Sequence, residues 1–227
     1  MRDPPVLRVA TTRRWTHTRK MKGEEIANSI AHGIGAALSV AGLVALVVAA
    51  LDRPAWQIVA CAIYGTSLVL LYTSSTIYHA LANNRAKRVF KILDHSSIYL
   101  LIAGTYTPVT LIALRGPWGW TLFGVVWGLC VCGVVFSSLW IGRLKVASTV
   151  VYLLMGWCAV VALRPLLEVL PWTGFAWLLA GGLCYTVGVA FYVNSRRFAH
   201  FIWHLFVVAG SLCHYWAVFR YVLRAPS

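Results

Sequence analysis

Long apolar segments alternate with short polar ones along nearly all of the 227-residue chain. An α-helix needs about 20 mostly apolar residues to cross the hydrocarbon core of a bilayer. Seven segments meet that length, near residues 26–50, 55–80, 92–114, 118–140, 147–167, 174–194 and 200–222. The pattern therefore predicts an all-α membrane protein, a bundle of seven transmembrane helices. The alternative is a bundle of six, if the fifth or the sixth segment does not cross the membrane.

The composition agrees with lipid as the main solvent. Hydrophobic residues make up 60% of the chain and charged residues only 11%, whereas soluble domains are about half apolar and a quarter charged. The six cysteines all lie inside apolar segments and form no CxxC pair. We therefore expect neither a disulfide framework nor a thiolate metal site.

The net charge of +14 does not indicate a nucleic-acid partner, because the basic residues lie in short segments between the apolar ones. Fifteen of the twenty Lys and Arg residues fall in the N-terminal tail and in every second loop. The positive-inside rule then predicts an N-terminus in the cytoplasm and a C-terminus outside. Residues 1–25 become a basic cytoplasmic tail. Residues 26–227 become the transmembrane domain, whose first helix is retained rather than cleaved as a signal peptide.

This topology places most of the histidines in one layer near the cytoplasmic face. Ionisable groups inside a membrane are costly, so a cluster of them points to function. Only one acidic residue, Asp94, stands at the start of an otherwise apolar helix. The histidines that share its layer are His32, His79, His95, His200 and His204.

The spacing of these histidines indicates a metal site. His200 and His204 are four residues apart, so both rings project from one helical face. Together with His79 they give three nitrogen ligands, and three protein ligands with an open position are typical of catalytic zinc. Other divalent metals also accept imidazole. Asp94 would then act as a base toward an activated water or orient a ligand histidine. Ser75, one turn from His79, would donate a hydrogen bond to a developing oxyanion.

Plainer interpretations stay open at this point. A histidine pair in a membrane helix often makes hydrogen bonds between helices, and a serine there often bonds to its own backbone. His32 and His95 are better read as structural residues than as ligands. His214 lies about 15 Å beyond His204 along the helix, where it would form an interhelical hydrogen bond or line a cavity.

A catalytic triad of Ser75, His79 and Asp94 is a further alternative. It assigns no role to His200 and His204, and it is therefore the weaker explanation.

Four motifs in order along the chain resemble the hemolysin III family, within the progestin and adipoQ receptor superfamily. Residues 25–33, 74–79, 93–98 and 200–204 read EIANSIAHG, SSTIYH, LDHSSI and HFIWH. The resemblance extends from about residue 22 to the C-terminus, and the conjunction of the four motifs makes it specific.

The resemblance implies a seven-helix bundle with zinc near the cytoplasmic face. Its ligands would be His79, His200 and His204, with Asp94 contacting the zinc-bound water and Ser75 beside the metal. The adiponectin receptors among these relatives are associated with hydrolysis of the ceramide amide bond. The bacterial members carry a hemolysin label and are linked to membrane lipid homeostasis.

The favoured function is a zinc-dependent hydrolase of an amide or ester bond in a membrane lipid. Membrane lipids would be its partners, and the substrate would occupy an apolar intramembrane cavity. The expected location is the cell membrane of a bacterium, plasma or inner, as a multi-pass protein. The alternatives are a zinc-containing sensor or receptor without catalysis, and, with less support, a transporter or a cytolytic pore.

Overall fold

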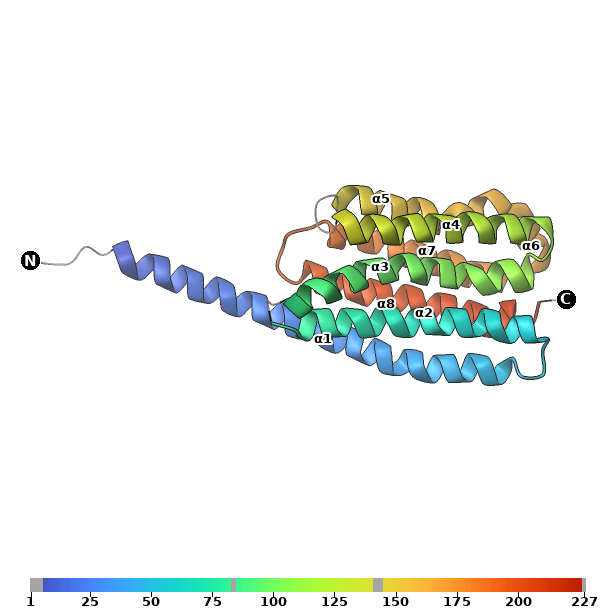
Figure 1. The fold of residues 1–227 in the computed structure, drawn as a ribbon, viewed down its shortest axis with the longest axis horizontal. Coiled ribbons are helices and arrows are strands. Elements are labelled where there is room, and N and C mark those ends of the chain that lie inside the picture. The colour runs from blue at the N-terminus through green and yellow to red at the C-terminus, as the bar shows by residue number, and fades with distance from the viewer. Residues whose placement is uncertain (1–5, 83–84, 141–144, 226–227) are drawn as a thin grey trace, which may run out of the picture.

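The computed structural model describes residues 6–82, 85–140 and 145–225, which form helices and connecting turns without β-strands. Seven helical segments in this part of the chain are long and apolar enough to cross a membrane (Figure 1). This confirms the seven-span prediction over the six-span alternative. The segments are Lys22–Ala49, Ala55–Ala80, Arg85–Ala113, Pro117–Leu139, Val146–Val169, Trp172–Tyr192 and Ala199–Val222.

The helices follow each other closely along the chain. Their bounds are α1 Val6–Ala49, α2 Ala55–Ala80, α3 Arg85–Pro108, α4 Pro117–Trp140, α5 Lys145–Gly156, α6 Leu163–Val169, α7 Trp172–Tyr192 and α8 Ala199–Ala217. π-helical turns prolong α3 over Val109–Ala113 and α8 over Val218–Val222, and a 3-10 turn at Cys158–Ala162 joins α5 to α6.

Two helices begin earlier than the apolar pattern suggested. The helix α1 starts at Val6 and extends beyond the end of the bundle, so most of the predicted tail is helical (Figure 1). The helix α3 starts at Arg85 rather than near residue 92, which places Lys87 on a helix instead of in a loop. Hydropathy detects only the part of a helix that lies inside the lipid. The polar first turns of α1 and α3 are therefore not detected by it. The predicted linker residues 83–84 and 142–143 lie outside the described residues.

The fifth span is one helix interrupted by a 3-10 turn. The hydroxyl of Tyr106, on α3, bridges this break: it donates to the Gly156 carbonyl at 2.8 Å and accepts from the Ala159 backbone N–H at 2.8 Å. A side chain of a neighbouring helix thus satisfies backbone groups that the interruption frees, as lipid-embedded backbone requires.

The helix α3 lies in the interior of the bundle. Of its most apolar 18-residue window, 78% is buried, against 17–50% for the other six spans. It contacts α2, α4 and α5. Contacts between α1 and α2, between α1 and α8, and between α7 and α8 complete the bundle. The helix that carries Asp94 is therefore the one most shielded from lipid.

Glycines allow α7 and α8 to approach each other closely. A Cβ atom on Gly210 would lie 3.1 Å from the backbone oxygen of Gly181, and a Cβ atom on Gly181 would collide with the imidazole of His214. Small residues at such contacts are typical of packed membrane helices. This contact fixes the position of α8, which carries two of the predicted ligands.

Candidate metal centre

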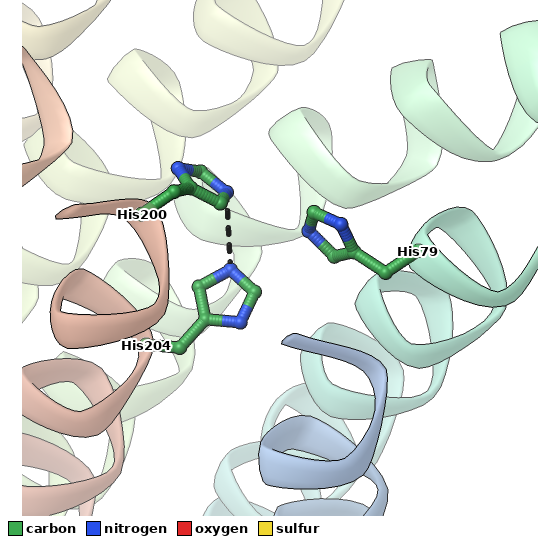
Figure 2. A group of neighbouring side chains, drawn as sticks. All are labelled: His79, His200 and His204. Atoms are coloured by element: carbon green, nitrogen blue, oxygen red, sulfur yellow. Dashed lines mark hydrogen bonds between the residues drawn. The ribbon is translucent and has the colours of Figure 1, made fainter. Parts of the chain in front are cut away.

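Three imidazoles from two distant parts of the sequence meet at one end of the bundle. His79 lies in the last turn of α2, and His200 and His204 lie in the first turns of α8 (Figure 2). One ring nitrogen from each lies within 4.8 Å of those of the other two. His79 and His204 are buried, and His200 is half-buried. The structure thus brings together the three predicted ligands.

The ring nitrogens of this group are close enough together to hold a cation. The Nε2 atoms of His200 and His204 are 3.1 Å apart. Within the described part of the chain, the buried His79 Nε2 atom has no hydrogen-bond partner. A buried polar atom left unpaired costs about 1–3 kcal/mol. Three imidazole nitrogens gathered in this way could bind a divalent metal ion.

The local sequence explains how both histidines of α8 reach the centre. Phe198 adopts a left-handed conformation (φ 63°) just before the helix. This turn starts α8 at Ala199, so His200 falls in the first helical turn and His204 in the second. The spacing of four residues then places both rings on one face.

Glu25, the last residue of the predicted tail, contacts one of these histidines. The Oε2 atom of Glu25, on α1, lies 3.0 Å from His79 Nδ1 and 3.1 Å from Lys87 Nζ. The amide Nδ2 of Asn28 lies 3.5 Å from the same His79 nitrogen. The sequence does indicate that Glu25 shares a helical face with Asn28 and His32. The three residues are separated by three and four positions, which are the spacings of neighbours on a helix surface.

His32 supports His204 rather than joining the group of three. Its ring stacks on that of His204 with the centroids 3.7 Å apart and the planes at 11°, and it meets the Tyr72 ring edge-on at 5.0 Å. Stacking between two rings fixes their relative orientation. The structural role expected for His32 stays a prediction.

Asp94 and Ser75 lie beside the histidines. Asp94 interacts electrostatically with His79, His95 and Ser75. Its Oδ2 atom is 3.5 Å from His95 Nδ1, and its side chain is 15% exposed. Ser75 is completely buried, and no residue that the structure describes forms a hydrogen bond of standard geometry with its hydroxyl. The catalytic roles of both side chains stay predictions.

The two other membrane histidines bond to backbone carbonyls. His95 Nδ1 lies 3.0 Å from the Lys91 oxygen, and His214 Nε2 lies 2.9 Å from the Leu178 oxygen. The second bond joins α8 to α7. His214 also lines a cavity, so both roles considered for it from the sequence are present.

An apolar cavity of about 110 Å³ lies between α2, α3, α5, α7 and α8. Its lining includes Trp157, Tyr185, Tyr192, Trp203 and His214. Among the described lining residues none belongs to the histidine group. Tyr192 connects the two, because it lines the cavity and its ring centroid is 5.9 Å from that of His200.

Comparison with known proteins agrees with this architecture. Residues 21–215 match the family model described as "Haemolysin-III related". The chain belongs to the hemolysin III family. Hemolysin-3 from Bacillus cereus is 46% identical over 218 residues, which cover 95% of this chain and 100% of that protein. The Hemolysin-3 homolog of Bacillus subtilis (strain 168) is 45% identical, over 89% of this chain and 96% of that protein.

A more distant relative is eukaryotic. The human protein named monocyte to macrophage differentiation factor is 29% identical over 184 residues, or 78% of this chain and 76% of its own. The hemolysin III match spans all four motifs and every side chain of the histidine group. This protein is therefore a multi-pass membrane protein of the hemolysin III family, with a group of histidines suited to a metal ion.

Proposed function

We propose that this protein is a zinc-dependent hydrolase of an amide or ester bond in a membrane lipid, with a role in lipid homeostasis in a bacterial cell membrane. The observation that carries the proposal is the meeting of His79, His200 and His204 beside a carboxylate and a buried hydroxyl. An apolar cavity, lined in part by Tyr192, lies next to this group. The bacterial relatives support the location.

Zinc is the metal that this donor set favours. Three imidazole nitrogens with further coordination positions open are typical of catalytic zinc sites, whereas magnesium and calcium prefer oxygen ligands. Zinc bound there would supply a Lewis acid that polarises a carbonyl group and activates water at neutral pH.

The surrounding side chains have separate tasks in this proposal. Asp94 accepts the proton of the attacking water, because it is the acidic side chain beside the ligands that is not engaged with His79 Nδ1. Ser75 Oγ donates a hydrogen bond to the oxygen on which charge develops. The apolar cavity holds the lipid chain, and Tyr192 lies where the cavity meets His200.

The charge distribution supports a centre near the cytoplasmic face. His79 lies in the last turn of α2 and His200 in the first turn of α8. The basic N-terminal part of α1 projects from the end of the bundle where α2 ends and α8 begins (Figure 1). Basic residues flanking spans are retained on the cytoplasmic side. We infer that the N-terminus is cytoplasmic and the C-terminus outside.

One observation favours a second candidate, a zinc-containing sensor without catalysis. Tyr192 and Trp203 both line the cavity with their ring centroids 5.3 Å apart, and the Tyr192 ring centroid is 5.9 Å from that of His200. In this alternative, zinc joins α2 to α8 and a lipid in the cavity changes their separation. Turnover of lipid by the purified protein distinguishes the two candidates.

The test of the metal centre is elemental analysis of the purified protein. We expect about one zinc per chain in the wild type and its loss in the double variant His200→Ala/His204→Ala. The matched control is His214→Gln, which changes a histidine of the same helix outside the group and should keep the metal. A correctly folded wild type without metal would overturn the proposal.

A further inference from the structure

We propose that Glu25 is a positioning residue for the metal centre, which holds His79 in the tautomer and orientation that leave its Nε2 atom available as a ligand. This inference rests on the metal binding of the proposed function. It assigns a task to the first helix, which contributes no ligand to the group of three.

The first step is the chemistry of the short contact. An ionised carboxylate has no hydrogen to donate. At 3.0 Å from Glu25 Oε2, His79 Nδ1 must therefore carry the proton and donate it. In a neutral imidazole the other nitrogen is then unprotonated. That nitrogen, Nε2, is buried and has no hydrogen-bond partner among the described residues.

The second step is orientation. Figure 2 shows one ring nitrogen of His79 turned toward His200 and His204. Because Nδ1 is occupied by Glu25, the nitrogen that faces the pair is Nε2. A carboxylate that binds the far nitrogen of a ligand histidine fixes the ring and strengthens it as a ligand.

The third step is competition from a neighbour. The Nδ2 atom of Asn28 lies 3.5 Å from His79 Nδ1. This amide nitrogen is a donor, and a donor at Nδ1 favours the opposite tautomer, with the hydrogen on Nε2. A hydrogen on Nε2 would block metal binding. The contact to Glu25 is shorter, within the range of a good hydrogen bond, and selects the productive tautomer.

The fourth step is the support of Glu25 itself. Lys87 Nζ, on α3, lies 3.1 Å from Glu25 Oε2 and donates to the Leu81 carbonyl, just after α2, at 3.2 Å. Its ammonium also lies 5.0 Å from the centroid of the Tyr78 ring. The side chains of Glu25 and Lys87 are 32% and 18% exposed, so solvent screens this ion pair less than a fully exposed one. The pair thus joins α1, α2 and α3 behind the ligand.

The test compares zinc affinity in the full-length protein by competition with a chelator. Glu25→Ala should weaken zinc binding by about 10–100-fold, the usual effect of removing such a partner. Glu25→Gln should lose less, about tenfold or below, because its amide oxygen still accepts from Nδ1. The adjacent carboxylate provides the control: Glu24→Ala should bind zinc as the wild type does. A Glu25→Ala protein with wild-type affinity would overturn the proposal.

A second measurement separates positioning from mere stabilisation of the fold. Nitrogen chemical shifts of ¹⁵N-labelled histidine in the metal-free protein, assigned with His79→Gln, report which ring nitrogen carries the hydrogen. We expect Nδ1–H at His79 in the wild type and its loss in Glu25→Ala. An Nε2–H tautomer in the wild type would refute the positioning role. Because this reading needs no metal, it tests Glu25 even if the wild type contains no zinc, a result that would count against the proposed function instead.

Discussion

Unpaired polar atoms gather around the histidine group at the scale of single residues. Within the parts of the chain that are described, the buried atoms without a hydrogen-bond partner include nitrogens of His32, His79 and His204 and the hydroxyl of Ser75. Each such atom costs about 1–3 kcal/mol, and inside lipid no bulk water is at hand to relieve it. A bound ion with its water and substrate would satisfy several of them together. The cluster is therefore better explained by ligand binding than by stability.

Asp94 provides the sharpest residue-scale prediction about chemistry. Asp94→Asn keeps the size of the side chain and removes the proton acceptor. We expect zinc content to stay at the wild-type level while hydrolysis of a fluorescent lipid amide in detergent micelles falls by about 10²–10⁴-fold. Unchanged turnover in a zinc-loaded Asp94→Asn protein would contradict its role as base.

The sequence was sufficient for the three histidines but not for Glu25. His79, His200 and His204 were grouped because topology placed them in one layer and helical spacing put two of them on one face. Glu25 was assigned to the tail, since the apolar pattern of the first span begins after it. Its contact with His79 spans 54 residues of sequence, and its partner Lys87 was placed in a loop. Neither contact follows from a pattern within one helix.

At the scale of helices, hydropathy predicted the spans and missed their interruptions. The 3-10 turn in the fifth span depends on the hydroxyl of Tyr106, from another helix. Pro165 is one local signal of this interruption, because it lacks the N–H that a continuous helix would use there. With α6 beginning at Leu163, Pro165 falls in the first turn, where that N–H has no partner within the helix. Pro108 lies inside α3, and a π-helical turn follows it directly.

Two adjacent glycines of α7 make a matched pair for testing the contact with α8. A Cβ atom at Gly181 would collide with the His214 imidazole, whereas at Gly182 the nearest atoms are those of Trp157 at 3.9 Å. Both changes to alanine raise helix propensity equally. We expect Gly181→Ala to destabilise the protein by about 1–3 kcal/mol through overpacking, and Gly182→Ala to be neutral or slightly stabilising. Thermal unfolding in detergent measures both, and equal shifts for the two variants would contradict the packing argument.

At the scale of the whole molecule, the outer surface of the bundle is suited to lipid. Along α1, Ile26, Ile30, Ile34 and Leu38 recur every four residues, and each is more than half exposed. A stripe of this kind would be unfavourable in water. The polar side chains of the centre instead face inward from α1, α2, α3 and α8, so the same helices separate a lipid-facing surface from a buried site.

The orientation of the molecule decides which aqueous compartment the centre faces. In the predicted topology, fifteen Lys and Arg residues lie on one side of the membrane and five on the other. The positive-inside rule places the side with fifteen in the cytoplasm. We therefore expect a C-terminal alkaline phosphatase fusion to be active, since that enzyme works only outside the cytoplasm, and a C-terminal green fluorescent protein fusion to be dark. The same reporters placed after Ala82, in the second-to-third loop, should show the reverse pattern. If the C-terminal fluorescent fusion were bright, the molecule would be inverted. The histidine group would then face the outside, and a lipid of the outer leaflet, rather than of the cytoplasmic leaflet, would be the substrate to assay.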